Sequence, residues 1–331
     1  CGSWLQSAAP AQLSGMSHPD LERLTIATTT DLVETLPMLL GFHPEESLVV
    51  VAVDANQVVV TARTDLPGPT STLSPALGQL WARFPSACFV FIGLSSRPHR
   101  AWEALRALDA DLPEGTQRRY LVADGERWYE APTDPTGTPY DRVGNVHLAR
   151  AAFGGRPVRS SRDELTALLE PAWSPADVRA ALVRVEARLG GVRDLRARAD
   201  ALLAAHTLEG PDLTLDDATL LCLASHDQDF LDAHLWALTK DTAAAHQRLW
   251  LQVVRGSVPA CSGGALIGLG ISAWLAGEGA VHTVCLEKLG RVAGPPDWVD
   301  LLDLINTAAL SPDDWETLRE QRRTLLPLIG G

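Results

Sequence analysis

Two runs rich in β-branched residues stand close together near the start of the chain. Residues 47–54 (SLVVVAVD) and 57–65 (QVVVTARTD) are joined by a short polar link, and this pattern predicts a β-hairpin. The preceding segment, residues 31–40, has helical periodicity, with Asp31 in position to cap it and Gly41 in position to end it. We therefore expect a helix followed directly by a hairpin.

Helices and strands then alternate. A serine–proline pair opens a predicted helix over 74–84, and the continuous apolar run at 88–94 (CFVFIGL) is typical of a fully buried strand. A further helix is predicted over 98–112. Residues 118–123 (RRYLVA) and 126–131 (ERWYEA) indicate two strands joined at an Asp-Gly turn. The order β-β-α-β-α-β-β, with a parallel crossover, predicts a mixed α/β sheet domain.

The part of the chain beyond residue 145 shows no convincing strand. The turn-rich stretch 133–145 predicts a boundary loop. Beyond it, Ser174, Thr214 and Ser311 each precede a first turn rich in acids, which is typical of helix starts. The apolar stretch 263–276 is too short to cross a membrane and predicts a buried helix. The second half should therefore be all-helical, with a solenoid-like or bundle-like arrangement.

The length of 331 residues fits two domains. We predict an α+β protein with a mixed α/β domain at residues 16–145 and an all-helical domain at 146–331. Residues 1–15 lack periodicity and precede Met16, so we expect an N-terminal extension or expression remnant outside the fold. A processed lipoprotein terminus is the alternative for this segment.

Charge and cysteine content limit the partners. The chain has 41 Asp+Glu against 28 Lys+Arg, a net charge of −13, which is the wrong sign for a protein held mainly by phosphate charges. Its five cysteines are scattered and form no Cys-x-x-Cys pair, as expected in a reducing compartment. We expect a cytoplasmic, acidic protein that binds a protein partner or a small-molecule ligand, with no nucleic acid and no membrane.

Several motifs, taken in order, suggest a family. They are DLVETLPMLLGFHPEESLVVVAV at 31–53, TARTDLP at 61–67, GTPYD at 137–141, SSRDELTALLEP at 160–171 and AWLAGEGA at 273–280. In this order they resemble an actinobacterial domain-of-unknown-function family, DUF4192, over roughly Leu24 to Ala280. The resemblance implies a cytoplasmic protein of a high-GC bacterium, and it implies no activity.

The predicted topology brings several loops to one end of the sheet. The loops before the first hairpin strand and after the second share an end because hairpin strands are antiparallel. If the next two strands follow by right-handed parallel crossovers, their C-terminal loops reach this end too, where open α/β sheets bind ligands. We call this end the candidate edge. Its predicted ligand-contacting residues are His43, Glu45, Glu46, Arg63, Asp65, Ser95, Ser96, Arg97 and His99.

These residues allow two kinds of site chemistry. They include histidine and carboxylate groups suited to acid/base work, and the helix behind Pro98 offers its N-terminus to an anion. A capped turn at HPEES and an ion pair between Arg63 and Asp65 explain part of the same set without any ligand. GTPYD, after the last strand, should form an inter-domain turn away from the candidate edge.

Motifs for other chemistry are missing from the sequence. It has no phosphate-binding loop, dinucleotide fingerprint or nucleophile elbow, so we predict no cofactor. His226 and His234 lie too far apart on one helix to share a metal, and we predict no metal ligands.

The leading functional hypothesis is binding, with a ligand or partner at the candidate edge and a helical interaction surface. The alternative is a hydrolase or transferase acting on a small phosphorylated or acylated metabolite, with His43 or His99 as base.

Overall fold

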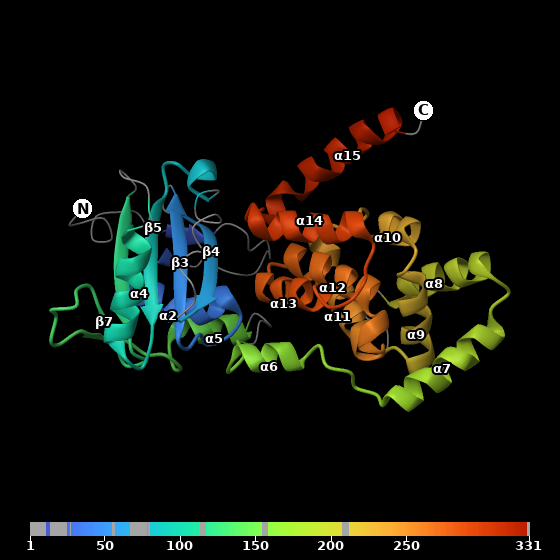
Figure 1. Ribbon diagram of the computed structural model, residues 1–331, viewed down its shortest axis with the longest axis horizontal. Helices are drawn as coiled ribbons and strands as arrows, with labels where there is room; N and C mark the ends of the chain where they lie inside the picture. Colours follow the sequence, from blue (N-terminus) through green and yellow to red (C-terminus); the bar gives the residue numbers. More distant parts are fainter. Residues whose placement is uncertain are drawn as a thin grey trace. The chain divides into compact units, whose positions relative to one another are not determined.

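The chain forms two compact units. The computed structural model describes residues 11–13, 25–26, 28–54, 57–66, 78, 80–110, 112, 117–153, 158–206 and 212–329. We call the units the α/β unit (Cys1–Arg162 with Thr307–Ala309) and the helical unit (Asp163–Asn306 with Leu310–Gly331). A mixed sheet followed by many helices confirms the predicted α+β class (Figure 1). The predicted domain boundary between residues 145 and 146 stays a prediction.

The α/β unit is built on an eight-stranded mixed sheet of order β2-β1-β4-β3-β5-β6-β7-β8. Its strands and helices are β1 (Ala11–Leu13), β2 (Thr25–Ile26), α2 (Thr29–Leu40), β3 (Ser47–Asp54), β4 (Gln57–Asp65), β5 (Cys88–Leu94), α4 (Pro98–Ala110), β6 (Arg118–Ala123), β7 (Arg127–Tyr129), β8 (Thr138–Pro139) and α5 (Val146–Phe153). The predicted hairpin is confirmed as β3 and β4, which pair with Ser47 opposite Asp65. The predicted helix over 98–112 and the strands at 88–94 and 118–123 are also present.

Strand directions place four strand ends together. β4 and β5 both pair antiparallel with β3, one on each side of it, so they run in the same direction. β6 runs parallel to β5. The start of β3 and the ends of β4, β5 and β6 therefore lie at one end of the sheet, which is the candidate edge.

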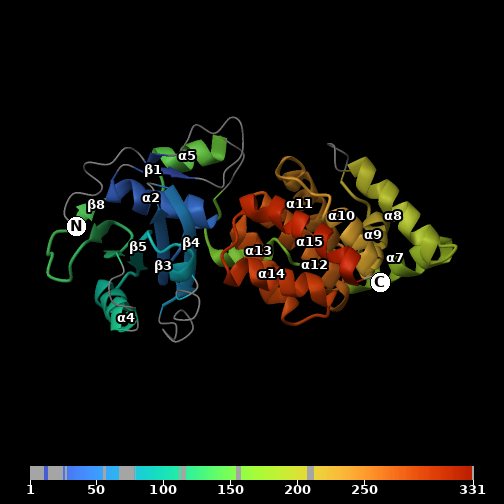
Figure 2. The same cartoon turned by 90° about the horizontal axis from the view of Figure 1, so that it is seen from above.

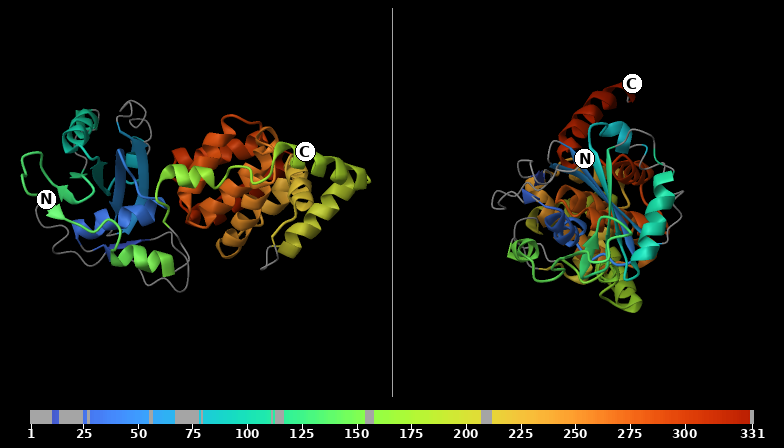
Figure 3. Two further views of the ribbon diagram at one scale, coloured as in Figure 1. Left: turned by 90° about the horizontal axis from the view of Figure 1, so that it is seen from below. Right: turned by 90° about the vertical axis from the view of Figure 1, so that its left-hand side faces the viewer.

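Helices cover both faces of this sheet. Figures 2 and 3 show α4 on one face and α2 with α5 on the other. Residues at alternate positions of β3 and β5, such as Val50 and Phe91, join Trp102 and Leu105 of α4 in one buried cluster. The other residues of β3 up to Ala52, including Val49, are buried as well. A continuous β-branched run is what a strand covered on both faces requires.

The start of α2 differs in detail from the prediction. The cap is Thr28, whose hydroxyl accepts a hydrogen bond from the Asp31 N–H, while the Asp31 carboxylate accepts one from the Thr28 N–H. Asp31 is thus the acidic member of a capping box and not the cap itself, because the helix begins two residues earlier than expected. Gly41 ends the helix with φ of 75°, as its lack of a side chain allows.

Two further expectations are wrong. Part of residues 1–15 belongs to the sheet, because β1 pairs parallel with β4, with Gln12 opposite Gln57. The stretch 133–145, expected to be a loop, contains a short strand, since β8 pairs antiparallel with β7. The predicted start of a helix at Ser74-Pro75 lies outside the described residues, and residues 80–83 are helical.

The helical unit packs around one buried helix. Its elements are α6 (Arg162–Ala167), α7 (Pro175–Arg188), α8 (Val192–His206), α9 (Leu215–Ala224), α10 (Gln228–Leu235), α11 (Lys240–Arg255), η1 (Pro259–Cys261), α12 (Gly263–Leu275), α13 (Gly279–Leu289), α14 (Pro296–Thr307), η2 (Pro312–Asp314) and α15 (Trp315–Ile329). Every residue of α12 is buried, as predicted. A Cβ atom at Gly268 would lie 2.5 Å from the Trp250 ring, so the glycine allows α11 and α12 to pack closely.

The predicted helix starts in this unit are confirmed. Ser174 and Thr214 cap α7 and α9 through their hydroxyls, and Ser311 caps a single 3-10 turn that continues into α15. None of the described helices combines the length and apolar composition needed to cross a membrane.

Candidate functional site

Glu46 is the centre of the hydrogen bonds at the candidate edge. Its carboxylate accepts hydrogen bonds from the Ser95 hydroxyl at 3.0 Å, the Ser96 N–H at 3.0 Å and the Ser96 hydroxyl at 3.0 Å. The Ser95 hydroxyl oxygen accepts a bond from the Arg97 N–H in turn. The loops before β3 and after β5 are thereby joined directly ahead of α4. Four of the predicted residues, Glu46, Ser95, Ser96 and Arg97, are joined by these hydrogen bonds.

Glu46 also has an unusual backbone. Its φ of 39° lies in the left-handed region, which costs a residue with a side chain about 1–2 kcal/mol. Burial by itself would raise the pKa of the Glu46 carboxyl, but the hydrogen bonds from Ser95 and Ser96 and the nearby Arg100 outweigh it and lower the pKa. Glu46 is therefore a carboxylate at neutral pH, and it occupies the N-terminal end of α4 where we predicted an anion.

Arg63 and Asp65 form an ion pair, which is the arrangement expected if these two residues have no ligand to bind. The Arg63 Nη2 lies 2.5 Å from Asp65 Oδ1, and the Arg63 Nε donates to the hydroxyl of the buried Ser47 at 2.9 Å. The guanidinium also lies 5.8 Å from the centre of the Phe42 ring. Only 13% of the Arg63 side chain is exposed. Arg63 therefore holds β3 and β4 together at this end of the sheet.

Glu45 and His43 belong to the same loop before β3. Glu45 forms an ion pair with Arg142, with 2.6 Å between Oε1 and Nη2. Burial and the charge of Arg142 lower the pKa of His43, and the charge of Glu45 opposes them. The His43 Nδ1 atom is buried and has no hydrogen-bond partner among the described residues. His43 is consequently a neutral imidazole at neutral pH.

The start of α4 is flanked by exposed basic residues. Arg97, His99 and Arg100 all have exposed side chains, and α4 has no acidic residue in its first turn. His99 makes no hydrogen bond or ion pair with the other predicted residues in the described part of the chain. Arginines at a helix N-terminus oppose the helix dipole, which favours negative charge there. The Glu46 carboxylate supplies the negative charge that the helix N-terminus favours.

GTPYD lies elsewhere than predicted. Because β8 runs antiparallel to β7, the chain returns toward the candidate edge, where Arg142 reaches Glu45. The Asp141 N–H donates to Glu34 Oε1 of α2 at 2.8 Å. The expectation of a turn away from the candidate edge was wrong because the short strand β8 was not predicted.

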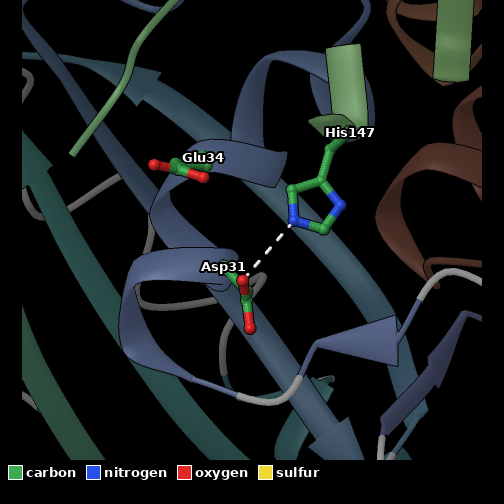
Figure 4. A group of neighbouring side chains, drawn as sticks. All are labelled: Asp31, Glu34 and His147. Carbon is green, nitrogen blue, oxygen red and sulfur yellow. Dashed lines mark ion pairs between the residues drawn. The ribbon is translucent and has the colours of Figure 1, made fainter. Parts of the chain in front are cut away.

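A second group of side chains was missed by the sequence analysis. Asp31 and Glu34 of α2 and the buried His147 of α5 each offer one ligand atom, and these atoms lie within 4.8 Å of one another (Figure 4). The i, i+3 spacing of the two acids was a visible signal for one helix face. Nothing in the sequence pattern connected His147 to them, because it follows the strand that was not predicted.

Comparison with known proteins assigns the chain to a family but not to an activity. The family model described as domain of unknown function (DUF4192) matches residues 30–299, which is most of the chain. No curated protein and no solved structure matches it. The match spans both units and all the motifs that suggested the resemblance, and the chain belongs to the DUF4192 family.

Proposed function

We propose that the α/β unit is a binding module and that the candidate edge contacts an anionic ligand. The proposal rests on the observation that two locally unfavourable features occur at one place. Glu46 adopts a backbone conformation that disfavours side chains, and the adjacent helix end carries exposed cations where its dipole favours anions. Such local conflicts are typical of functional sites, where stability is given up for a required geometry.

The hydrogen bonds at this helix end support a ligand position beyond the backbone. Glu46 already accepts the Ser96 N–H, so the backbone end of α4 is satisfied from within the chain. The exposed side chains of Arg97, His99 and Arg100 extend beyond it. We infer that a phosphate or carboxylate of the ligand is held by these side chains, because arginine forms strong, charge-assisted hydrogen bonds with both groups.

The test is a thermal-shift screen of the full chain against phosphorylated and carboxylated metabolites. For a compound that raises the melting temperature, Arg97→Ala should weaken the affinity by about 1.5–3 kcal/mol, the value of a hydrogen bond to a charged group. Arg106→Ala is the matched control, because Arg106 is an exposed arginine of the same helix farther from the candidate edge. Equal loss in both variants, or loss in neither, would show that the edge does not bind the compound.

The alternative, a hydrolase or transferase, is favoured by one observation. A general base must be unprotonated at neutral pH, and the lowered pKa of His43 meets this condition. Turnover of any compound found in the screen, followed by NMR, tests it. Loss of turnover in His43→Gln with unchanged binding would support an enzyme, whereas binding without turnover supports the module. The helical interaction surface stays a prediction.

A further inference from the structure

Asp31, Glu34 and His147 meet where α2 packs against α5. Asp31 and Glu34 are three residues apart on α2 and therefore share a face of that helix. His147 is the second residue of α5. Figure 4 shows its imidazole directed toward the two carboxylates, and one ligand atom from each residue lies within 4.8 Å of the others. Two acids and one imidazole are thus collected from distant parts of the sequence.

The separation of Asp31 and His147 suits a shared ion better than a hydrogen bond. The distance between Asp31 Oδ1 and His147 Nε2 is 3.6 Å. A hydrogen bond between these atoms would be about 2.7–3.2 Å long. Two ligands of one tetrahedral zinc, each about 2.1 Å from the metal, are about 3.4 Å apart. Little movement is needed for both atoms to contact one ion.

The burial of His147 is an independent observation. Only 6% of its side chain is exposed, and its Nδ1 atom has no hydrogen-bond partner among the described residues. A buried polar atom without a partner destabilises a fold. Nδ1 lies on the side of the ring away from the carboxylates, so an ion at Nε2 would not satisfy it. The observation that favours a metal ligand is that a buried imidazole turns its Nε2 toward two acids.

Hydrogen bonds from the backbone orient both carboxylates. The Thr28 N–H donates to Asp31 Oδ2 at 2.9 Å, which turns Oδ1 toward the imidazole. The Asp141 N–H donates to Glu34 Oε1 at 2.8 Å. Such outer contacts fix the orientation of metal-binding side chains and raise their affinity.

We propose that Asp31, Glu34 and His147 bind one divalent transition-metal ion, with Zn²⁺ as the best match. Imidazole suits Zn²⁺ and other late first-row metals, and the two carboxylates balance the charge of the ion. Three protein ligands leave at least one coordination position open to water or another ligand. The site is separate from the candidate edge and does not depend on the function proposed there.

Zinc titration of the full chain tests this site. The protein is stripped with EDTA and titrated with Zn²⁺ by calorimetry. We expect one equivalent to bind, and Asp31→Asn and Glu34→Gln each to lower the affinity at least about tenfold. Both substitutions keep an oxygen that accepts the backbone N–H, so α2 should remain folded. Glu103→Gln is the matched control, since Glu103 is an exposed acid on α4 at the other sheet face, and it should bind Zn²⁺ like the wild type.

The wild-type protein offers a readout that needs no variant. Coordination should move the imidazole nitrogen resonances of His147 on addition of one equivalent of Zn²⁺. Binding of less than one equivalent, unchanged His147 resonances, or equal affinity in the Glu34→Gln and Glu103→Gln proteins would each overturn the site. In that case Asp31 and His147 are neighbouring side chains 3.6 Å apart that share no ion.

Discussion

Substitutions at Glu46 separate the energy of its hydrogen bonds from the strain of its backbone. Glu46→Ala removes the carboxylate that accepts from Ser95 and Ser96 but keeps a side chain at φ of 39°. Hydrogen bonds to a charged group contribute about 1.5–3 kcal/mol, and solvent screening of the partly exposed carboxylate favours the low end of this range. We expect Glu46→Ala to lower the free energy of unfolding of the α/β unit by about 1.5 kcal/mol.

Glu46→Gly loses the same hydrogen bonds and also relieves the strain. Relief of the backbone strain should raise the free energy of unfolding by about 1–2 kcal/mol. The greater freedom of glycine in the unfolded chain should lower it by about 0.5–1 kcal/mol. The glycine variant should therefore be more stable than the alanine variant by about 0.5–1 kcal/mol. This order is the reverse of that expected at an ordinary loop position with negative φ.

Hydrogen exchange measured by mass spectrometry on peptides from β3 and β5 reports the stability of the α/β unit by itself. Amides of both strands should exchange fastest in Glu46→Ala, more slowly in Glu46→Gly and most slowly in the wild type. Wild-type exchange rates in Glu46→Ala would show that the carboxylate does not stabilise the edge. Faster exchange in Glu46→Gly than in Glu46→Ala would show that the backbone there is not strained.

Three further outcomes are expected. Because the pKa of Glu46 is lowered in the folded protein, its stabilising contribution is present above its ordinary pKa of 4.5 and is lost as the pH falls through the lowered value. The difference in urea midpoint between wild type and Glu46→Gln should accordingly be present at pH 7 and disappear in acid, and a constant difference would contradict this. Gly268→Ala should destabilise the helical unit by about 1–3 kcal/mol, because the added atom would contact a tryptophan ring. Gly279→Ala is the control and should leave the stability unchanged, since nothing lies within 4 Å of its added atom. Equal melting temperatures of the two variants would refute the close packing. Iodoacetamide should label the exposed Cys261 well before Cys285, because burial raises the pKa of the Cys285 thiol. Peptide mass mapping follows the labelling, and equal labelling rates at the two cysteines would disprove this.

Local signals in the sequence were sufficient for most of the fold. The β-branched runs of β3 and β4, the apolar run of β5 and the capping serines and threonines of the helical unit each act within a few residues. Elements held mainly by distant partners were missed. β1 pairs with β4 across more than forty residues, and β8 consists of a threonine and a proline, a residue that central strands exclude.

The candidate edge was predictable because it follows from strand direction alone. Once β4 and β5 each pair antiparallel with β3 and β6 runs parallel to β5, the start of β3 must meet the ends of the other three strands. The details that give the site its character were not predictable. No local sequence pattern indicates the positive φ of Glu46, and its hydrogen bonds to Ser95 and Ser96 join residues that are about fifty positions apart in the chain. Whether these residues contact a ligand stays a prediction.

Two of the motifs that carried the family resemblance meet in the α/β unit. Asp141, at the end of GTPYD, donates its N–H to Glu34 of the motif at 31–53. The next residue, Arg142, pairs with Glu45 of the same motif. His147, five residues farther on, faces Asp31. The segment 141–147 therefore contacts both the candidate edge and the proposed cation site. An ion that fixes Glu34 and His147 would also fix this segment, and any energetic coupling between the two sites must be equal in both directions.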